Sequence, residues 1–422
     1  MRASNIKSDT PFSIRSNKSL GIQNYDLGND FPQKVEEIVR ASGTGMSCVR
    51  VYRKFIFGGG FKNTDVSKVV ANRRGQTLDY ILKQCAADFA LYHGFALHVN
   101  YNAIFRITEI YHIPFEHCRF EAKGKETRTF SRVAVYDDWT LRDPERRTIK
   151  KDEIDFIDLF DPKPALIEEQ VKAAGGWHKY KGQIYYYSGD GEKEYPAPIF
   201  SAELTNMRSE EGVDNVVGRN VCSNFLPGAI IVDINNTTES SEDFKQMKAE
   251  LRQFVGDENA GNLFAMQVDS KESVPVKIDL HADNYDKEFA VTQKYLPDAI
   301  GRAFSQPPIL RAQDVGANFG ADIITNAYKY YNAQTAEERA ELSRVFMQLF
   351  ERWHVVGELT DADVTPLSYN SGASKAEIMG EKTVENVIGV ITNPDLTTDQ
   401  KLYMLQMFYD FEPNEAVELL KK

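Results

Sequence analysis

The sequence predicts an α+β protein, with a sheet region and helical regions in separate stretches of the chain. Short, partly alternating apolar runs between residues 95 and 187 are typical of strands. Apolar residues at helical spacing lie on both sides of this stretch. Two further helices, over 201–223 and 285–304, flank a compact strand–helix–strand unit. With 422 residues, the chain can bury a sizeable core and hold about two to four domains.

Residues 1–29 are expected to form a mobile arm, because they mix Ser, Asn, Asp and Gly with few large apolar side chains. Regular structure is expected to begin at Asp30, a helix-capping residue followed by Pro32 in the first turn. Helical spacing continues over 48–56, and a further helix is predicted from Thr77 to Gly94. The region before the sheet is therefore predicted to be helical.

The sheet region is predicted to be antiparallel. Four apolar runs lie between Phe95 and Tyr136. These runs are FALHVNYN, IFRITEIY, CRFEA and RVAVYDD. The segments IDFIDLF at 154–160 and QIYYY at 183–187 add further β-structure.

Long helices are predicted in the second half of the chain. After the helix over 201–223, a unit made of AIIVDI, a helix over 241–255 and NLFAMQV leads into the helix over 285–304. A longer helix follows from 321 to 353, with an interruption near Ala333, and the last fifty residues form short helices. Two long helices that flank a small insert predict a hairpin with a domain at its tip. That shape suits assembly with neighbouring subunits.

The composition argues against several classes of protein. The longest apolar runs are far too short to span a bilayer, and the polar N-terminus lacks the apolar stretch of a secretory signal. The four cysteines lie far apart without a CxxC pair, which favours a reducing compartment and ordinary burial over disulfides or zinc. The formal net charge of −12 argues against tight binding of nucleic acid, which depends on a basic excess.

Two short motifs have a functional interpretation and a simpler structural one. The glycines at 58–60 could cradle a phosphate, but they follow a helical segment and no Gly-Lys-Ser/Thr comes next, so a helix end and a turn are favoured. A nuclease would need carboxylates that converge on metal ions, and segment 152–161 is rich in them. They are Asp152, Glu153, Asp155, Asp158 and Asp161. On a strand, Asp155 and Asp161 point to one face and Asp158 to the other, which favours solvated side chains.

The histidines and aromatic residues do not define a site. His112, His117 and Cys118 have no partner pair at metal spacing, so structural roles are predicted for them, as for His93 and His98. Aromatic groups such as 185–187 could stack on bases, but they lie outside dense Lys/Arg clusters, which favours packing or subunit contacts. The chain also lacks GxGxxG, GxSxG and HExxH motifs. We therefore predict no catalytic residues, no cofactor and no metal.

The order of segments resembles that of tailed-bacteriophage portal proteins, the head–tail connector family. DFALYHGFALHVNYN is similar to the family's wing region, and ELTNMRSEEGVDNVVGRNVCSNFLPGAIIVDI to its sequence of helix, Asn-Phe, Pro-Gly turn and strand. FKQMKAELRQFVGDENAGNLFAMQVD resembles the clip helix, turn and next strand of the family. KEFAVTQKYLPDAIGRAFSQPPILRA resembles the second stem helix and the residues before the tunnel loop. The resemblance covers roughly residues 33–355, and within it the wing segment from Lys123 to Tyr187 departs from the family pattern.

The resemblance implies a portal fold with a wing, a helical stem, a small α/β clip and a helical crown. The implied divisions are a mobile N-terminal arm at 1–29, the first part of the wing at 30–200, a stem helix at 201–224, the clip at 225–283, a second stem helix at 284–304, the tunnel loop at 305–320, the long wing helix and its return at 321–373, and the crown at 374–422.

The resemblance also implies a non-enzymatic ring of about twelve subunits at one vertex of a virion capsid, made in the host bacterial cytoplasm and not attached to a membrane. Double-stranded DNA would pass through the ring during packaging and ejection. Terminase, a head-completion or adaptor protein and the major capsid protein are the implied partners. An acidic chain suits such a channel, because like charge weakens the sticking of DNA. We expect the narrowest point to be lined by loop residues Gln306, Ile309, Arg311, Gln313, Asp314 and Asn318.

Three alternatives stay open on the sequence alone. A different ring-forming phage component, such as an adaptor, would usually be much shorter. A metal-dependent phage nuclease would use the carboxylates from Asp152 to Asp161 and would require them to converge. A soluble bacterial protein of another role would behave as a monomer at all concentrations.

Overall fold

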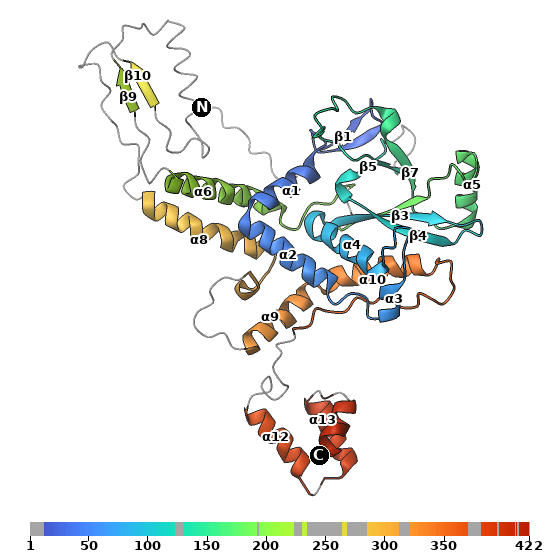
Figure 1. Cartoon of the computed structure of the whole chain (residues 1–422), viewed down its shortest axis with the longest axis vertical. Coiled ribbons are helices and arrows are strands. Elements are labelled where there is room, and N and C mark those ends of the chain that lie inside the picture. The colour runs from blue at the N-terminus through green and yellow to red at the C-terminus, as the bar shows by residue number, and fades with distance from the viewer. Residues whose placement is uncertain are drawn as a thin grey trace. The chain divides into compact units, whose positions relative to one another are not determined.

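The α+β class predicted from the sequence is confirmed by the computed structural model (Figure 1). The structure describes residues 12–122, 130–191, 194–222, 230–233, 264–267, 285–311, 321–369, 381–394, 396–409, 411 and 413–421. The chain divides into two compact units. Unit 1 contains residues 1–313 and 331–367, and unit 2 contains residues 314–330 and 368–422.

Residues 12–29 are folded, so the prediction that regular structure begins at Asp30 is wrong. Strands β1 (Ile14–Asn17) and β2 (Ile22–Tyr25) form an antiparallel hairpin. Three of its apolar side chains, Phe12, Ile22 and Tyr25, are buried, and Tyr25 stacks on Tyr195 with ring centroids 4.2 Å apart. Pairing and burial against distant residues thus order a segment whose local composition favours a mobile chain. Residues 1–11 of the predicted arm lie outside the described residues.

The first helices agree with the predicted pattern. They are α1 (Phe31–Ala41), α2 (Gly43–Phe57), α3 (Thr64–Lys68) and α4 (Leu78–Tyr92). Thr77 caps α4 by accepting a hydrogen bond from the N–H of Tyr80 (3.3 Å), as expected for this residue type. Asp30 precedes α1 but its side chain accepts no capping bond, and it instead forms an ion pair with Lys34 at 2.9 Å.

Six strands form one sheet in the order β4-β3-β8-β7-β6-β5. They are β3 (Gly94–Tyr101), β4 (Ile107–Ile113), β5 (Cys118–Phe120), β6 (Arg132–Val135), β7 (Asp155–Leu159) and β8 (Gln183–Ser188). Neighbours are antiparallel as predicted, except that β7 and β8 are parallel. A parallel pair needs a crossover connection, and helix α5 (Pro164–Ala174), which the sequence analysis did not predict, lies between these two strands.

Helices α4 and α10 (Ala336–Phe350) pack against one face of this sheet. Phe89 of α4 stacks on Tyr187 of β8 with centroids 5.5 Å apart, and Tyr185 of the same strand donates a hydrogen bond to Gln348 of α10 (2.9 Å). Tyr186 points to the opposite face, where it meets Phe115 and Phe120. The three consecutive tyrosines therefore serve packing, in agreement with the structural interpretation.

The helical half also follows the prediction. Helices α6 (Leu204–Cys222) and α8 (Tyr285–Ala303) flank strands β9 (Ile230–Asp233) and β10 (Phe264–Gln267), which pair in parallel. The helix predicted at 241–255 lies outside the described residues. Helix α9 (Ala321–Gln334) is separated from α10 at Thr335, close to the predicted interruption. Buried Arg339 occupies this break, where it donates hydrogen bonds to Thr335 Oγ1 (2.6 Å) and to Phe55 O of α2 (2.7 Å).

Unit 2 contains three short helices, as predicted for the end of the chain. They are α12 (Glu381–Thr392), α13 (Thr398–Tyr409) and α14 (Pro413–Lys421). Val387, Val390, Leu405 and Ala416 form their common core. Over the part of the chain that the structure describes, no helix is both long and apolar enough to cross a membrane.

Acidification from pH 7.5 to pH 5.5 is expected to destabilise unit 1. Burial lowers the pKa of His93, His98 and His117, so the folded chain takes up protons at lower pH than the unfolded chain. The contribution of these histidines to the unfolding free energy of unit 1 is therefore fully present above the unfolded pKa of about 6.5. It falls as the pH drops from there through the folded pKa, by up to ~1.4 kcal/mol per pH unit for each histidine. Urea midpoints followed by tryptophan fluorescence measure this, since all three tryptophans lie in unit 1.

His98→Gln is the matching variant for this pH dependence. His98 Nε2 donates to the carbonyl oxygen of Lys181, and a glutamine amide can keep a donor there without titrating. The variant is expected to flatten the pH dependence by up to one proton. An unchanged slope would contradict the assignment.

Candidate functional site

Among the elements of unit 1, the pair of helices α6 and α8 differs most from the closed core of a globular domain. The two helices pack side by side (Figure 1), α6 also packs against α1 and α2, and α8 packs against α2. The pair is therefore attached to unit 1 through helices α1 and α2.

The side chain of Glu210 anchors α6 to the start of α2. It is buried, and it accepts hydrogen bonds from the Ser42 hydroxyl, from the Thr44 hydroxyl and from the Thr44 N–H (3.2 Å). A carboxylate in this position is stabilised by the free N–H groups and the dipole of the helix N-terminus. Ser42 in turn accepts a hydrogen bond from the Gly45 N–H at 2.9 Å. One residue of α6 thus completes the cap of α2.

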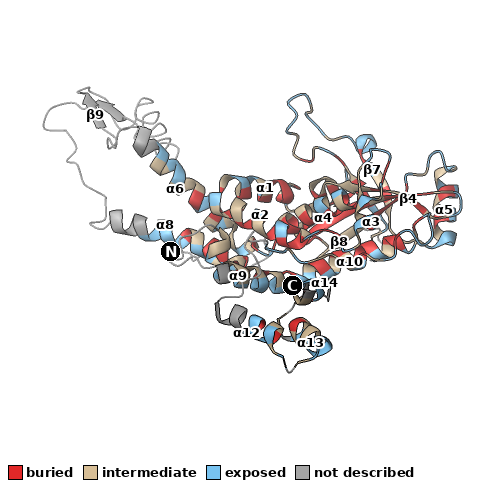
Figure 2. Cartoon of the chain, turned by 60° about the horizontal axis from the view of Figure 1, so that its bottom comes forward, coloured by how far each residue is buried: buried red, intermediate tan, exposed pale blue. Residues whose placement is uncertain are grey.

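Helix α8 has one buried and one exposed apolar face. Leu296, Ala299 and Ile300 are buried, whereas Val291 and Tyr295 are 67% and 53% exposed. Figure 2 shows the same change along both helices, from buried residues near α2 to exposed and intermediate residues farther out. Val291 and Tyr295 are four residues apart and therefore share one side of the helix. Val291 and Tyr295 therefore form a small exposed apolar patch on α8, with the Arg302 guanidinium 5.9 Å from the centre of the Tyr295 ring.

The segment after α8 holds the start of the predicted tunnel loop. In the single chain the side chain of Gln306, one of the predicted channel residues, is only 5% exposed and lies between helices. Its amide donates hydrogen bonds to Cys48 O of α2 (2.7 Å) and to Tyr331 Oη of α9 (2.9 Å). This side chain therefore joins the end of α8 to α2 and α9 in the single chain.

Ile309 and Arg311 lie in a short 3₁₀ helix at Pro308–Arg311 and are half-buried. Nη1 of Arg311 donates a hydrogen bond to Pro297 O of α8 at 2.8 Å. Gln313, Asp314 and Asn318 lie outside the described residues. The expected channel contacts of the loop residues therefore stay a prediction.

The acidic residues of segment 152–161 do not converge. Asp155 pairs with Lys181, and Asp161 pairs with Lys163 at 2.9 Å. Asp158 lies opposite Arg132 in the neighbouring strand, and burial raises the pKa of its carboxyl while Arg132 opposes that effect. Within the described ranges, no three His, Cys, Asp or Glu side chains are grouped so that they could hold a metal ion. No observation thus favours the nuclease alternative.

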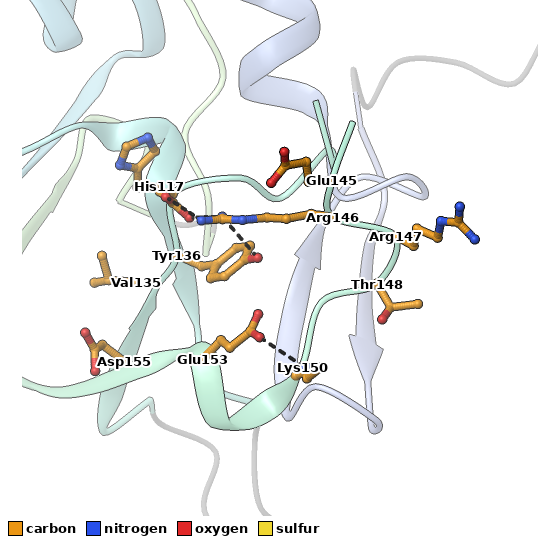
Figure 3. Close-up of a pocket in the computed structure, with 11 residues that line it drawn as sticks. His117, Val135, Tyr136, Glu145, Arg146, Arg147, Thr148, Lys150, Glu153 and Asp155 are labelled. Atoms are coloured by element: carbon orange, nitrogen blue, oxygen red, sulfur yellow. Dashed lines mark hydrogen bonds and ion pairs between the residues drawn. The ribbon is translucent and has the colours of Figure 1, made fainter. Parts of the chain in front are cut away.

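A cavity of about 620 Å³ lies beside this segment (Figure 3). Its charged side chains largely neutralise one another: Arg146 binds Asp137 at 2.7 Å and reaches Tyr136 Oη at 3.3 Å, and Lys150 pairs with Glu153 at 3.6 Å. Figure 3 shows Arg147 pointing away from the other lining residues. Burial lowers the pKa of His117, which favours its neutral form.

The remaining motifs have structural roles. Gly58 ends α2 with φ 59°, and a Cβ there would lie 1.9 Å from Thr365 O, so the position requires glycine. His112 pairs with Asp88 at 2.7 Å, which fixes β4 against α4. Cys48, Cys85 and Cys118 are buried free thiols, and burial raises the pKa of Cys48 to about 12. These positions agree with the structural interpretation of the glycine, histidine and cysteine motifs.

The sequence analysis missed the two contacts that fix the helix pair and the loop. Glu210 and Arg311 are single polar residues without a recognisable motif, and their partners are distant in the sequence. A local signal existed only for Arg311: Gly301 follows Pro297 by four residues inside α8, and helical glycines often mark a close approach.

No protein-family model and no curated protein match the chain. Several solved structures are similar to it. One of them is a phage portal protein. This HK97-family portal protein from Corynebacterium diphtheriae has a TM-score of 0.37 and 13% identity, over 74% of this chain and 89% of that chain. A chain of the virion of a native gene transfer agent particle has a TM-score of 0.46, and a chain from the neck of the native particle, computed with C12 symmetry, has 0.44. Each of these two is 11% identical and covers 89% of this chain and 93% of that chain.

Proposed function

We propose that this chain is a portal protein: a non-enzymatic subunit that assembles into a ring at one capsid vertex and forms a conduit for DNA. The proposal rests on the helix pair α6–α8, which packs against α1 and α2, and on the exposed apolar residues Val291 and Tyr295 of α8. A closed ring requires two different surfaces on each subunit, and a helical pair supplies them. In this assembly the Val291 and Tyr295 face would pack on a neighbouring subunit.

The charge of the chain supports a conduit rather than a DNA-binding protein. The chain carries a formal net charge of −12, whereas tight binding of a duplex needs many cations at the phosphates. A channel must let DNA slide, and like charge keeps the affinity low. The proposal therefore accounts for the acidic composition without requiring a binding site.

The proposed partners follow from the sequence resemblance. Terminase and a head-completion or adaptor protein would bind the region from 225 to 283, and the major capsid protein would surround the ring. The proposed location is the virion, after synthesis in the host bacterial cytoplasm. The predicted domain divisions at 201–224, 284–304 and 374–422 are compatible with the observed bounds of α6, α8 and the three helices of unit 2.

Negative-stain electron microscopy of the purified full chain tests the proposal. End-on views are expected to show rings of about twelve subunits with a central hole, because repetition of one heterologous contact closes into a ring. Uniform small particles across a range of salt and protein concentrations would leave the portal function without support.

A further inference from the structure

The turn after α8 is held in a conformation that its own residues do not favour. The N–H of Ser305 donates to Arg302 O (3.0 Å) and the N–H of Gln306 to Gly301 O (3.3 Å), the two bonds of a Schellman motif. This motif usually has glycine at the left-handed position, but Ser305 occupies it with φ 50°. A left-handed conformation is unfavourable for a residue other than glycine, because its Cβ lies too close to the following carbonyl oxygen. Contacts outside the turn must therefore keep it in place.

Gln306 provides the first of these contacts. Its two amide hydrogens reach Cys48 O and Tyr331 Oη, so one side chain joins the end of α8 to both α2 and α9. Its Oε1 is buried and has no hydrogen-bond partner in the described part of the chain. An unmatched buried acceptor is unfavourable, because it has lost its hydrogen bond to water without gaining another. An apolar residue would avoid that cost, but it could not hold both helices.

Arg311 provides the second contact, at the other end of the turn. Its guanidinium lies directly on Gly301, where an added Cβ would come within 1.6 Å of Nη1. From there it donates to Pro297 O, a carbonyl of α8 one turn before Gly301. Gly301 therefore makes room for the arginine. Residues 305–311 are thus tied to three helices within seven positions.

We propose that Gln306 and Arg311 are positioning residues for the loop at 305–320, which would line the DNA channel in the proposed portal function. They fix the entry of the loop to α2, α8 and α9, and they do not contact DNA themselves. The inference rests on the proposed function and replaces the channel-lining role that the sequence suggested for these two residues. The local costs at Ser305 and Gln306 are consistent with a turn kept for its geometry rather than for its stability.

Hydrogen–deuterium exchange of the full chain tests whether Gln306 and Arg311 hold the turn at residues 305–311 in place. Gln306→Leu removes the amide donors, and Gly301→Ala displaces the Arg311 guanidinium while leaving the arginine in place. Each is expected to speed exchange of residues 305–311 at least about tenfold, which corresponds to a loss of ~1.4 kcal/mol of local stability. The matched controls are Gln334→Leu, an exposed position of α9, and Gly389→Ala in α12, where a Cβ meets nothing within 4 Å. Unchanged exchange in both test variants would overturn the proposal that these two side chains hold the turn in place.

A second measurement tests positioning itself. In particles assembled with Gln306→Leu or Gly301→Ala subunits, we expect rings of unchanged symmetry but reduced retention of packaged DNA. Normal retention together with faster exchange would overturn the positioning role while leaving the contacts intact. Absence of rings in the unmodified chain would instead overturn the proposed function. The two failures can be told apart, because the exchange measurement does not depend on assembly.

Discussion

Replacement of Arg119 by leucine is expected to cost unit 1 about 3–5 kcal/mol of unfolding free energy. Arg119 is fully buried in β5 and lies between the rings of Tyr25 (5.6 Å) and Trp139 (5.4 Å). It donates hydrogen bonds to Asn29 Oδ1 (2.6 Å), Asn29 O (2.8 Å), Cys118 O (2.7 Å) and Glu116 O (3.0 Å). Leucine would leave three backbone carbonyl oxygens buried without these donors. It would also release the segment that joins the N-terminal hairpin to α1.

Urea unfolding followed by tryptophan fluorescence measures this loss. The signal reports on unit 1 alone, because Trp139, Trp177 and Trp353 all belong to it. Arg142→Leu is the control, since Arg142 is exposed in a loop and its change is expected to stay within about 0.5 kcal/mol. A loss below about 1 kcal/mol for Arg119→Leu would show that the guanidinium is not the main link between β5 and the hairpin.

Substitution of aspartate for Val291 or Tyr295 is expected to abolish ring assembly while leaving the subunit folded. Both side chains are exposed on α8 in the single chain, so neither change disturbs a core. In the proposed assembly each charge would be buried unpaired at every subunit contact, at a cost of about 2–5 kcal/mol per contact. This corresponds to a ~30-fold to several-thousand-fold weaker association at each interface. Sedimentation velocity at fixed protein concentration measures the shift from rings to monomers.

Val356→Asp is the control for these variants. Val356 is 80% exposed and lies in the loop after α10 rather than on α8. It is expected to assemble like the unmodified chain. Intact rings for both Val291→Asp and Tyr295→Asp would place the subunit interface elsewhere, whereas loss of the tryptophan signal would indicate unfolding instead.

The predicted helix bounds agree closely with the structure where local patterns are strong. Helix α4 begins after the cap residue Thr77, and α8 and the break at Thr335 lie within a few residues of their expected positions. These features depend on apolar spacing, capping and glycine or proline chemistry, all of which are local properties. The glycine turn after α2 and the buried cysteines follow for the same reason.

The errors occurred where partners distant in the sequence decide the structure. The hairpin at 12–29 is ordered by backbone contacts with Glu121 and Ala122, just after β5, and by stacking on Tyr195, although its composition resembles that of a mobile arm. Similarly, α5 changes the pairing of β7 and β8 from antiparallel to parallel. The hairpin lacks a local sequence signal. Helix α5 has one, with Pro164 in its first turn and Gly175 at its end, so in this case only the pairing of β7 with β8 depends on distant partners.

The sequence by itself determined the α+β class, the order of helices and strands apart from the N-terminal hairpin and α5, the acidic character of the chain and its resemblance to portal proteins. Only the tertiary structure decided that Gln306 is buried, that Glu210 caps α2 and that Arg311 lies on Gly301. The physical reason is that composition and periodicity are read along the chain. A polar side chain, in contrast, is assigned its role by the hydrogen-bond partners that folding brings within about 3 Å of it.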